Sequence, residues 1–371
     1  MRAIRKRPAA IAGVGALSLI VVVAACTLLS GAGGGTNAPG AGSGQSATQD
    51  GSSFGDIGLA SGLPAGDATA TAAQPSALAT ASSTVAATAT PRPPTPKPTA
   101  KPAPCSVLPA SNVWNKTITK LAVASNSAAM IDAIGLNAYL HPDFDAIGDG
   151  IPYNVVTSST ATYKVKFHYA SESDAGPYPI PSSPKIEKGS DRHLLSIDAS
   201  QCKLWELYDA RKSGSSWAAE SGAVFNLRSN GLRPAGWTSA DAAGLPIYPG
   251  LVRYSEVATG SINHALRFTA PDTCGYIYPA RHLTAATCSN LPPMGLRVRL
   301  KASVDISGFG SHAKVVLTAL KRYGMILADN GSPWYLSGSP DSRWNDDEMH
   351  KLQTLTGADF EVVNTGSLRN G

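Results

Sequence analysis

Residues 105–371 lack the short motifs that mark several common enzyme classes. They contain no phosphate-binding Walker A loop, no GxGxxG dinucleotide fingerprint, no HExxH zinc motif, no GxSxG nucleophile elbow and no CxxC pair. These absences remove P-loop ATPases, dinucleotide-dependent oxidoreductases, zincin proteases, α/β-hydrolases and thioredoxin-like redox proteins from the first rank of candidates.

Charged side chains are also scarce, at 15% of the sequence. The formal net charge is +5, but seven Lys or Arg and only three Asp precede residue 105. The remaining residues carry 24 basic and 23 acidic side chains, so the charges nearly cancel there. Because no run of Lys and Arg alternates with aromatic residues, we expect no binding to nucleic acid.

Residues 27–104 contain little besides Gly, Ser, Ala, Thr and Pro. Such a segment cannot bury enough apolar surface to offset the conformational entropy that ordering would cost. Its end, TATPRPPTPKPTAKPAP, favours extended polyproline II structure. We therefore expect a tether over 27–104 and one globular domain over 105–371, a length that is normal for an all-β sandwich or barrel.

The N-terminus has the pattern of a targeting segment. Four basic residues precede an apolar run from Ala9 to Ala25, which is followed by Cys26. This pattern resembles a bacterial lipoprotein signal over residues 1–26, which implies cleavage before Cys26 and its lipidation. An uncleaved membrane anchor is the alternative, because the run is nearly long enough to span a bilayer. Both interpretations predict an extracytoplasmic domain, which the first attaches to the bacterial cell membrane through a lipid.

Cysteine is rare, with five in the chain. If Cys26 is lipidated, four remain, which is an even number for an oxidising compartment and allows three pairings. We favour Cys274–Cys288, because these two are close in sequence and enclose a loop-like segment. This choice leaves Cys105–Cys202 as the second disulfide.

Short strand-like runs dominate residues 105–371. They are rich in Val, Ile, Tyr, Phe and Trp and are separated by Gly, Pro, Ser and Asp. The runs are 151–156, 163–170, 193–198, 203–209, 222–227, 264–270, 276–280, 295–302, 325–330, 333–338 and 359–364. They predict a mainly β single domain, resembling a β-sandwich or jelly-roll.

About three peripheral helices are expected beside these strands. One is SAAMIDAIGLNAYL, with Ser127 as its expected N-cap, and the second, SHAKVVLTALKRYG, ends at Gly324. In the third, NDDEMHKLQTL, Asn345 and Glu348 have the spacing of a capping box.

From about residue 109 onward the chain resembles secreted bacterial proteins of an uncharacterised family. The segments that carry the resemblance include LPASNVWN, SDRHLLSID, RPAGWTSADAAGLPIYPGLVRYSEV and LKRYGMILADNG. The resemblance covers most of the domain and implies that it is a family unit, but it implies no activity and no site.

One predicted hairpin, HLLSIDASQCKLWELYD, combines an apolar face with ionisable side chains. A turn of two or four residues around Ser200 places His193 directly opposite Glu206. Strand alternation then puts Asp191 and Tyr208 on the same face as this pair. A polar end on an apolar face predicts the wall of a cleft, and an ordinary surface His–Glu pair is the alternative.

Other candidates lie beside predicted strands and turns. Asp143 follows the first helix in a loop, and Asp329 is interpreted as a simple turn aspartate. His264 has apolar neighbours on its strand face, which is typical of a core histidine. Further candidates are Arg267, Arg281, His282, Trp205 and Trp237, and the two tryptophans can equally stack on sugars or fill the core.

These residues favour a carbohydrate-active enzyme that hydrolyses an extracellular or cell-wall polysaccharide with two carboxyl groups. Glu206 is the expected acid, oriented by His193, and Asp191 or Asp143 is its expected partner. Substrate contacts are expected from Tyr208, Trp205, Trp237, Arg281 and His282. We expect no cofactor and no metal.

Three alternatives stay open. A polysaccharide lyase would use His264 or Tyr208 as the base and Arg267 to neutralise a uronate. A non-catalytic glycan-binding or adhesion module would need only exposed aromatic residues. A metal site would combine Asp191, His193, Glu206 and a second histidine, a ligand set that suits Zn, Mn or Fe.

Overall fold

The largest sheet of the domain has six strands that run in mixed directions. The computed structural model describes residues 105, 107–285 and 290–366, and the strand order of this sheet is β1-β14-β11-β13-β12-β15. Two neighbouring pairs, β1/β14 and β11/β13, are parallel, and the other pairs are antiparallel. The strands are β1 (His141–Asp143), β11 (Leu266–Ala270), β12 (Arg297–Leu300), β13 (Met325–Asn330), β14 (Tyr335–Ser337) and β15 (Phe360–Val362).

Smaller sheets form the second part of the domain. A four-stranded sheet has the order β10-β7-β6-β2, in which β6 and β7 are an antiparallel hairpin and β2 runs parallel to β6. Its strands are β2 (Tyr153–Val155), β6 (Leu194–Asp198), β7 (Lys203–Tyr208) and β10 (Ser221–Asn226). The remaining sheets combine β4 (Val165–Phe167), β9 (Ser216–Ala219) and β8 (Arg211–Ser213), and β3 (Thr162–Tyr163) with β5 (Tyr178–Pro179).

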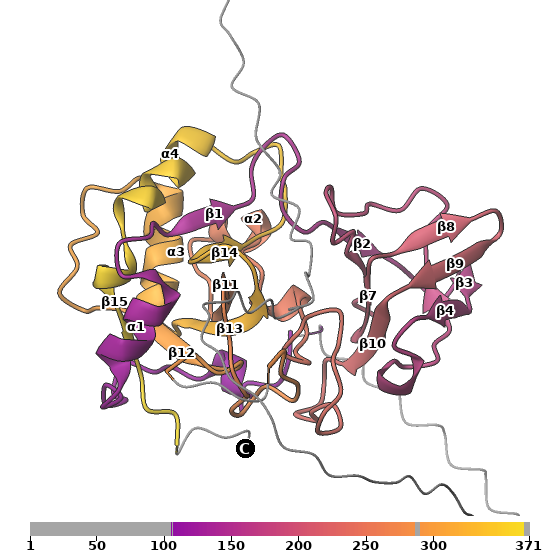
Figure 1. The fold of residues 1–371 in the computed structure, drawn as a ribbon. Helices are drawn as coiled ribbons and strands as arrows, with labels where there is room; N and C mark the ends of the chain where they lie inside the picture. The colour runs from indigo at the N-terminus through magenta and orange to yellow at the C-terminus, as the bar shows by residue number, and fades with distance from the viewer. Residues whose placement is uncertain (1–104, 106, 286–289, 367–371) are drawn as a thin grey trace, which may run out of the picture. The chain divides into compact units, whose positions relative to one another are not determined.

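The three expected helices form, and they pack around the six-stranded sheet (Figure 1). The expected N-cap of the first is wrong by one residue, since Asn126 holds that position and Ser127 is already helical. α1 (Ser127–Gly135) contacts β15, α3 (Ser311–Arg322) contacts β12, and α4 (Asp346–His350) contacts α3 and β1. Asn345 caps α4 by accepting the backbone N–H of Glu348 at 3.1 Å. The Glu348 carboxylate in turn accepts the first N–H groups of α3, so one local motif fastens two helices. The short helix α2 spans Tyr254–Val257.

The prediction of a mainly β domain is confirmed, but a jelly-roll arrangement is not, because both larger sheets contain parallel pairs. All but one of the expected runs contain a strand. The exception is 276–280, which forms only an isolated bridge from Tyr276 to Met294. The segment around Asp143, expected to be a loop, forms strand β1.

A small apolar cluster connects the four-stranded sheet with the loop that follows Ser239. It consists of Ile151, Leu195, Ala240, Ile247 and Leu251, all of them buried. The larger core lies between the six-stranded sheet and the helices and includes Phe268, Trp334 and Phe360, which are stacked on one another. The small cluster matters for function, because it holds the backbone of Ala240 against β6.

The Cys105–Cys202 disulfide is confirmed, with the two Cα atoms 5.4 Å apart. Cys288 and Cys26 lie outside the described residues, as do the whole expected signal and tether. No helix in the described part of the chain has the length and apolar character needed to cross a membrane.

Candidate functional site

The β6–β7 hairpin forms, but its expected register is wrong by two residues. Leu195, and not His193, lies opposite Glu206. The reason is a turn over Ala199–Cys202, closed by the Asp198 carboxylate, which accepts the backbone N–H groups of Ser200 and Gln201. A shift by two preserves strand alternation, so His193 stays on the same face, with its ring centroid 5.6 Å from that of Tyr208.

His193 is buried and hydrogen-bonded through both ring nitrogens. Nδ1 lies 2.5 Å from the Glu187 carboxylate, and Nε2 lies 3.0 Å from the carbonyl oxygen of Ala240. A carbonyl oxygen can only accept, so Nε2 carries a proton. Burial alone would lower the pKa of His193, but the hydrogen bond and charge of Glu187 outweigh it and raise the pKa to about 9. His193 is therefore an imidazolium that fastens the segment before Asp241.

This pair makes the stability of the domain depend on pH. The pKa of His193 rises from its usual 6.5 to about 9 on folding, so the folded chain binds this proton more tightly. The stabilisation is complete below pH 6.5 and is lost as the pH rises through about 9, at a cost of up to ~3 kcal/mol. Denaturant unfolding across this window should show the loss, and His193→Gln should flatten it. An equally steep profile in the variant would contradict this prediction.

A β-bulge brings Asp329 to the face of the six-stranded sheet that carries Arg267. Arg267 pairs with Ile326 and Phe268 with Leu327, but the register then shifts, and Thr269 pairs with Asp329. In a regular parallel pair Thr269 would face residue 328, and Asp329 would point to the opposite side of the sheet. The bulge places Asp329 on the face shared by Thr269 and Arg267.

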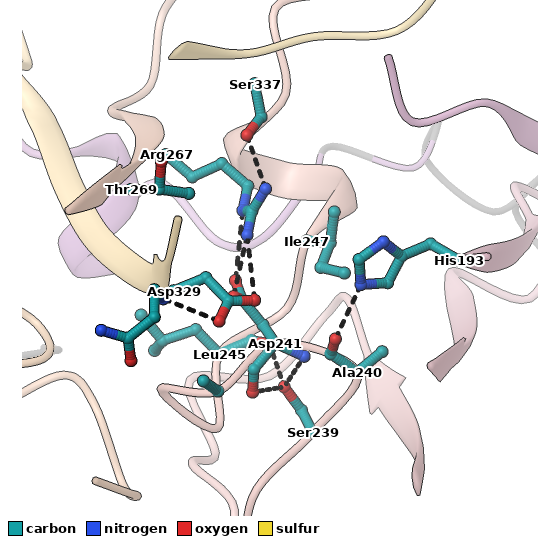
Figure 2. A network of polar contacts seen from close by, with 12 residues as sticks. His193, Ser239, Ala240, Asp241, Leu245, Ile247, Arg267, Thr269, Asp329 and Ser337 are labelled. Carbon is teal, nitrogen blue, oxygen red and sulfur yellow. Dashed lines mark hydrogen bonds and ion pairs between the residues drawn. The ribbon is translucent and has the colours of Figure 1, made fainter. Parts of the chain in front are cut away.

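Arg267 connects this strand with the buried carboxylate of Asp241. Its Nη2 and Nε lie 2.9 and 3.2 Å from the two oxygens of Asp241, and Nη1 donates to the Ser337 hydroxyl at 2.5 Å. Figure 2 shows the guanidinium between Ser337 and Asp241, with Asp329 beside Asp241. The Ser239 hydroxyl accepts the backbone N–H of Asp241 and so shapes the turn that presents this carboxylate.

Asp241 and Asp329 form a hydrogen-bonded carboxyl pair. Asp241 is 0% exposed, whereas the side chain of Asp329 is 24% exposed and lies 3.6 Å from Arg267 Nη2. Burial and the charge of Asp241 raise the pKa of Asp329 well above its usual value, although Arg267 acts in the opposite direction. Burial raises the pKa of Asp241 as well, and two carboxyls this close cannot both ionise easily, so the pair tends to keep one proton.

Asp329 lines a pocket of about 610 Å³ between the two larger sheets and the loop after Thr238, and the buried Asp241 lies at its base. Asp191, Tyr208 and His282 also line it, as do Glu172 and Tyr169. Burial and then the charges of Asp191 and Asp329 raise the pKa of Tyr208 to about 12, so its hydroxyl stays a donor. The pocket therefore combines an acid, an exposed carboxylate and neutral hydrogen-bonding groups.

Glu206 lies outside this pocket, so its expected position on a groove wall is wrong. Its side chain is 0% exposed, and its oxygens accept the backbone N–H groups of Ile247 and Tyr248 at 2.9–3.1 Å. These bonds hold the start of the 3-10 turn Tyr248–Gly250. Burial raises the pKa of Glu206 to about 7, against the effect of the two N–H groups.

Glu206→Gln should therefore lower stability and spare the chemistry. One oxygen can still accept both N–H groups, but the NH₂ group that replaces the other faces the N–H of Ile247, so a buried donor lacks an acceptor at a cost of ~1–3 kcal/mol. We expect a lower Tm and, per folded molecule, the turnover of the wild type. An unchanged Tm would contradict the structural role, and lost turnover in a fully folded variant would return Glu206 to the catalytic site.

The other expected site residues divide into two groups. Asp143 lies close to the site, since it pairs with Ser337 in β1/β14. Its pKa rises to about 6 through burial and the charge of Glu187, partly offset by Arg267. Four expected residues lie elsewhere. His264 lies between Arg253 and Glu256, and Trp205 lines a separate pocket with Lys203. Trp237 packs against the Arg233 guanidinium, and Arg281 donates to the carbonyl of Arg233.

A metal is the less suitable occupant of the acidic cluster. Glu187, Asp191 and His193 each offer one ligand atom, all within 4.8 Å of one another. However, both ring nitrogens of His193 already face acceptors, and an imidazolium cannot ligate a cation. Glu206, expected among the ligands, is not part of this group. The contacts fit an ion pair that orders the 187–193 segment.

No family model, no curated protein and no solved structure matches the chain. The resemblance to secreted bacterial proteins stays a prediction, and the chemistry of the pocket is interpreted from its own residues. Of these, sequence patterns missed Tyr169, Glu172 and Asp241, and they identified Asp329 only as a turn residue. They also missed Glu187, the partner of His193.

Proposed function

We propose that the domain hydrolyses glycosidic bonds of an extracellular or cell-wall polysaccharide, with Asp329 as the general acid. The observation that carries this proposal is the position of Asp329, which lines the pocket and lies against the buried pair of Asp241 and Arg267, where its pKa is raised. Cleavage of a glycosidic bond requires a proton on the leaving oxygen near neutral pH, and a carboxyl with a raised pKa supplies it.

Asp191 is the second carboxylate of the proposed reaction. It is exposed, and it lines the same pocket as Asp329 and Tyr208. In this role Asp191 activates water or attacks the anomeric carbon, and Asp329 donates its proton to the departing sugar. Asp241 and Arg267 touch no substrate and keep the Asp329 proton in place.

Two further side chains support a sugar ligand. Tyr169 lines the pocket with 49% of its surface exposed, so its ring can stack on a pyranose face. His282 lies at the same pocket with its ring held in place, since Nδ1 donates to the carbonyl of Ala242 at 2.8 Å and Nε2 lies 3.7 Å from the Glu172 carboxylate. Aromatic stacking beside neutral hydrogen-bonding groups is the usual chemistry of carbohydrate recognition.

The proposal includes a location outside the cytoplasm, with attachment to the membrane through a lipid on Cys26. The support is the lipoprotein-type pattern of residues 1–26 and the Cys105–Cys202 disulfide, since disulfides persist mainly in oxidising compartments.

Screening the purified domain against a panel of polysaccharides tests the proposed activity. New reducing ends without unsaturated products indicate hydrolysis, and unsaturated ends indicate a lyase. Binding of several glycans without any cleavage would contradict the enzyme proposal and favour a glycan-binding module.

A further inference from the structure

A second pocket, of about 770 Å³, has the opposite charge to the pocket around Asp329. Its cationic residues are Lys185, Lys188, Arg253 and Arg343, and Asp341 is its acidic residue. Tyr153 and Tyr254 also line it. The near-neutral total charge of residues 105–371 conceals this separation into a basic and an acidic pocket.

The structure presents Lys185 at a fixed place in this basic pocket. Asn154, a buried residue of β2, accepts the backbone N–H of Lys185 at 2.8 Å and donates to its carbonyl at 2.9 Å. A third bond joins Asn154 to the carbonyl of Leu195 in β6. The backbone at Lys185 is thereby tied to two strands, while the side chain of Lys185 is exposed.

The other cations differ in how much of their charge is available. Arg253 is buried and neutralised by Glu256 at 2.7 Å. Arg343 bonds both oxygens of Asp341 and lies 4.3 Å over the Tyr254 ring, but it is 60% exposed. Lys188 has an exposed contact with Asp149 at 3.7 Å, and such surface pairs exchange partners readily. Lys185 and Lys188 therefore supply most of the charge available to a ligand.

The basic pocket lies within reach of the acidic one. Lys185 and Lys188 line the first, Asp191 lines the second, and six residues of extended chain span at most ~20 Å. Glu172 and Asp191 line the acidic pocket, so an anionic group of a substrate is repelled there. A polymer that carries such groups needs a separate place for them.

We propose that the basic pocket binds an acidic group, a carboxylate or a phosphate diester, of the polysaccharide that is cleaved at Asp329. This inference rests on the proposed function and defines the substrate class as an anionic polymer. Lys185 and Lys188 pair with the acidic group, and Tyr153 and Tyr254 contact the sugar that carries it. The same anion is thereby kept away from the carboxyls that perform the cleavage.

Binding to the Asp329→Asn variant tests this inference without any turnover. Oligogalacturonate provides the carboxylate, poly(glycerol phosphate) provides the phosphate diester, and a neutral oligosaccharide of equal length is the reference. We expect at least one anionic ligand to bind more tightly than the neutral one. Adding Lys185→Glu and Lys188→Glu should weaken that binding by about tenfold or more and reduce its salt dependence.

Lys120→Glu is the matched control, because Lys120 is exposed and lies outside the basic pocket. If the double charge reversal lowers the Tm, Lys185→Gln alone replaces it. Equal affinity for neutral and anionic ligands, or unchanged binding in the Lys185 and Lys188 variants, would overturn the inference. Because only binding is measured, this result is independent of whether Asp329 proves to be a catalytic residue.

Discussion

Asp329→Asn will reduce glycosidic cleavage by about 10²- to 10⁴-fold, the usual contribution of a general acid. Asparagine has the shape of a protonated aspartic acid, and its NH₂ group can donate to Asp241 as the acid does. It cannot release a proton to the leaving oxygen. We therefore expect lost turnover together with a Tm close to that of the wild type, measured by reducing-end assay and thermal denaturation.

The matched control is Asp132→Asn, an exposed aspartate on α1, which should leave turnover unchanged. The wild type should also lose activity as the pH rises through the raised pKa of Asp329, because the acid then lacks its proton. Asp329→Asn with the turnover of the wild type would remove Asp329 from the reaction.

Arg267→Met will destabilise the domain by ~3–5 kcal/mol, the usual cost of leaving a buried charge without its partner. Asp241 is 0% exposed, and Arg267 is its cation at 2.9 Å. The substitution also removes the donor to the Ser337 hydroxyl. Denaturant unfolding should show a lower midpoint with an unchanged slope.

A double variant separates charge from packing in this result. Arg267→Met combined with Asp241→Leu removes both charges, so it should recover much of the stability lost by Arg267→Met alone. Arg211→Met is the matched surface control, since Arg211 is 65% exposed in its pair with Asp209 and should cost below ~1 kcal/mol. An Arg267→Met variant as stable as the wild type would contradict the buried-charge interpretation.

Local chemistry was sufficient to predict most of the elements. Asn345 caps α4, and Gly324, with a φ of 66°, follows α3 where a residue with a side chain would be strained. Strand composition identified β6 and β7, and alternation placed His193 and Tyr208 on one face. The register failed because it depends on the turn, in which Cys202 has a φ of 52° and its sulfur is bonded to Cys105. Asp198 signals a turn, but it does not determine whether the loop ends at Gln201 or at Cys202.

The candidate site was harder to predict, because its residues meet through long-range pairing. Asp241 lies in a run of small residues that signals no site. Its role depends on the ion pair with Arg267, which lies 26 positions later in the sequence. Asp329 precedes Asn330 and Gly331, a strong turn signal, and faces the pocket only because of the bulge opposite Thr269. Asp191, His193 and Arg267 were identified because charged side chains within apolar strands are conspicuous.

The Cys105–Cys202 disulfide also determines how the domain would carry a mechanical load. A pull on the chain ahead of residue 105 passes through the sulfur atoms directly to the β6–β7 turn, across a sequence separation of 97. The covalent loop between the two cysteines, which contains β1 to β6 and the Glu187–His193 pair, is shielded from tension. Stretching would therefore extend β7 and the strands that follow. Asp191 lies within the covalent loop, so the backbone around it would bear no tension.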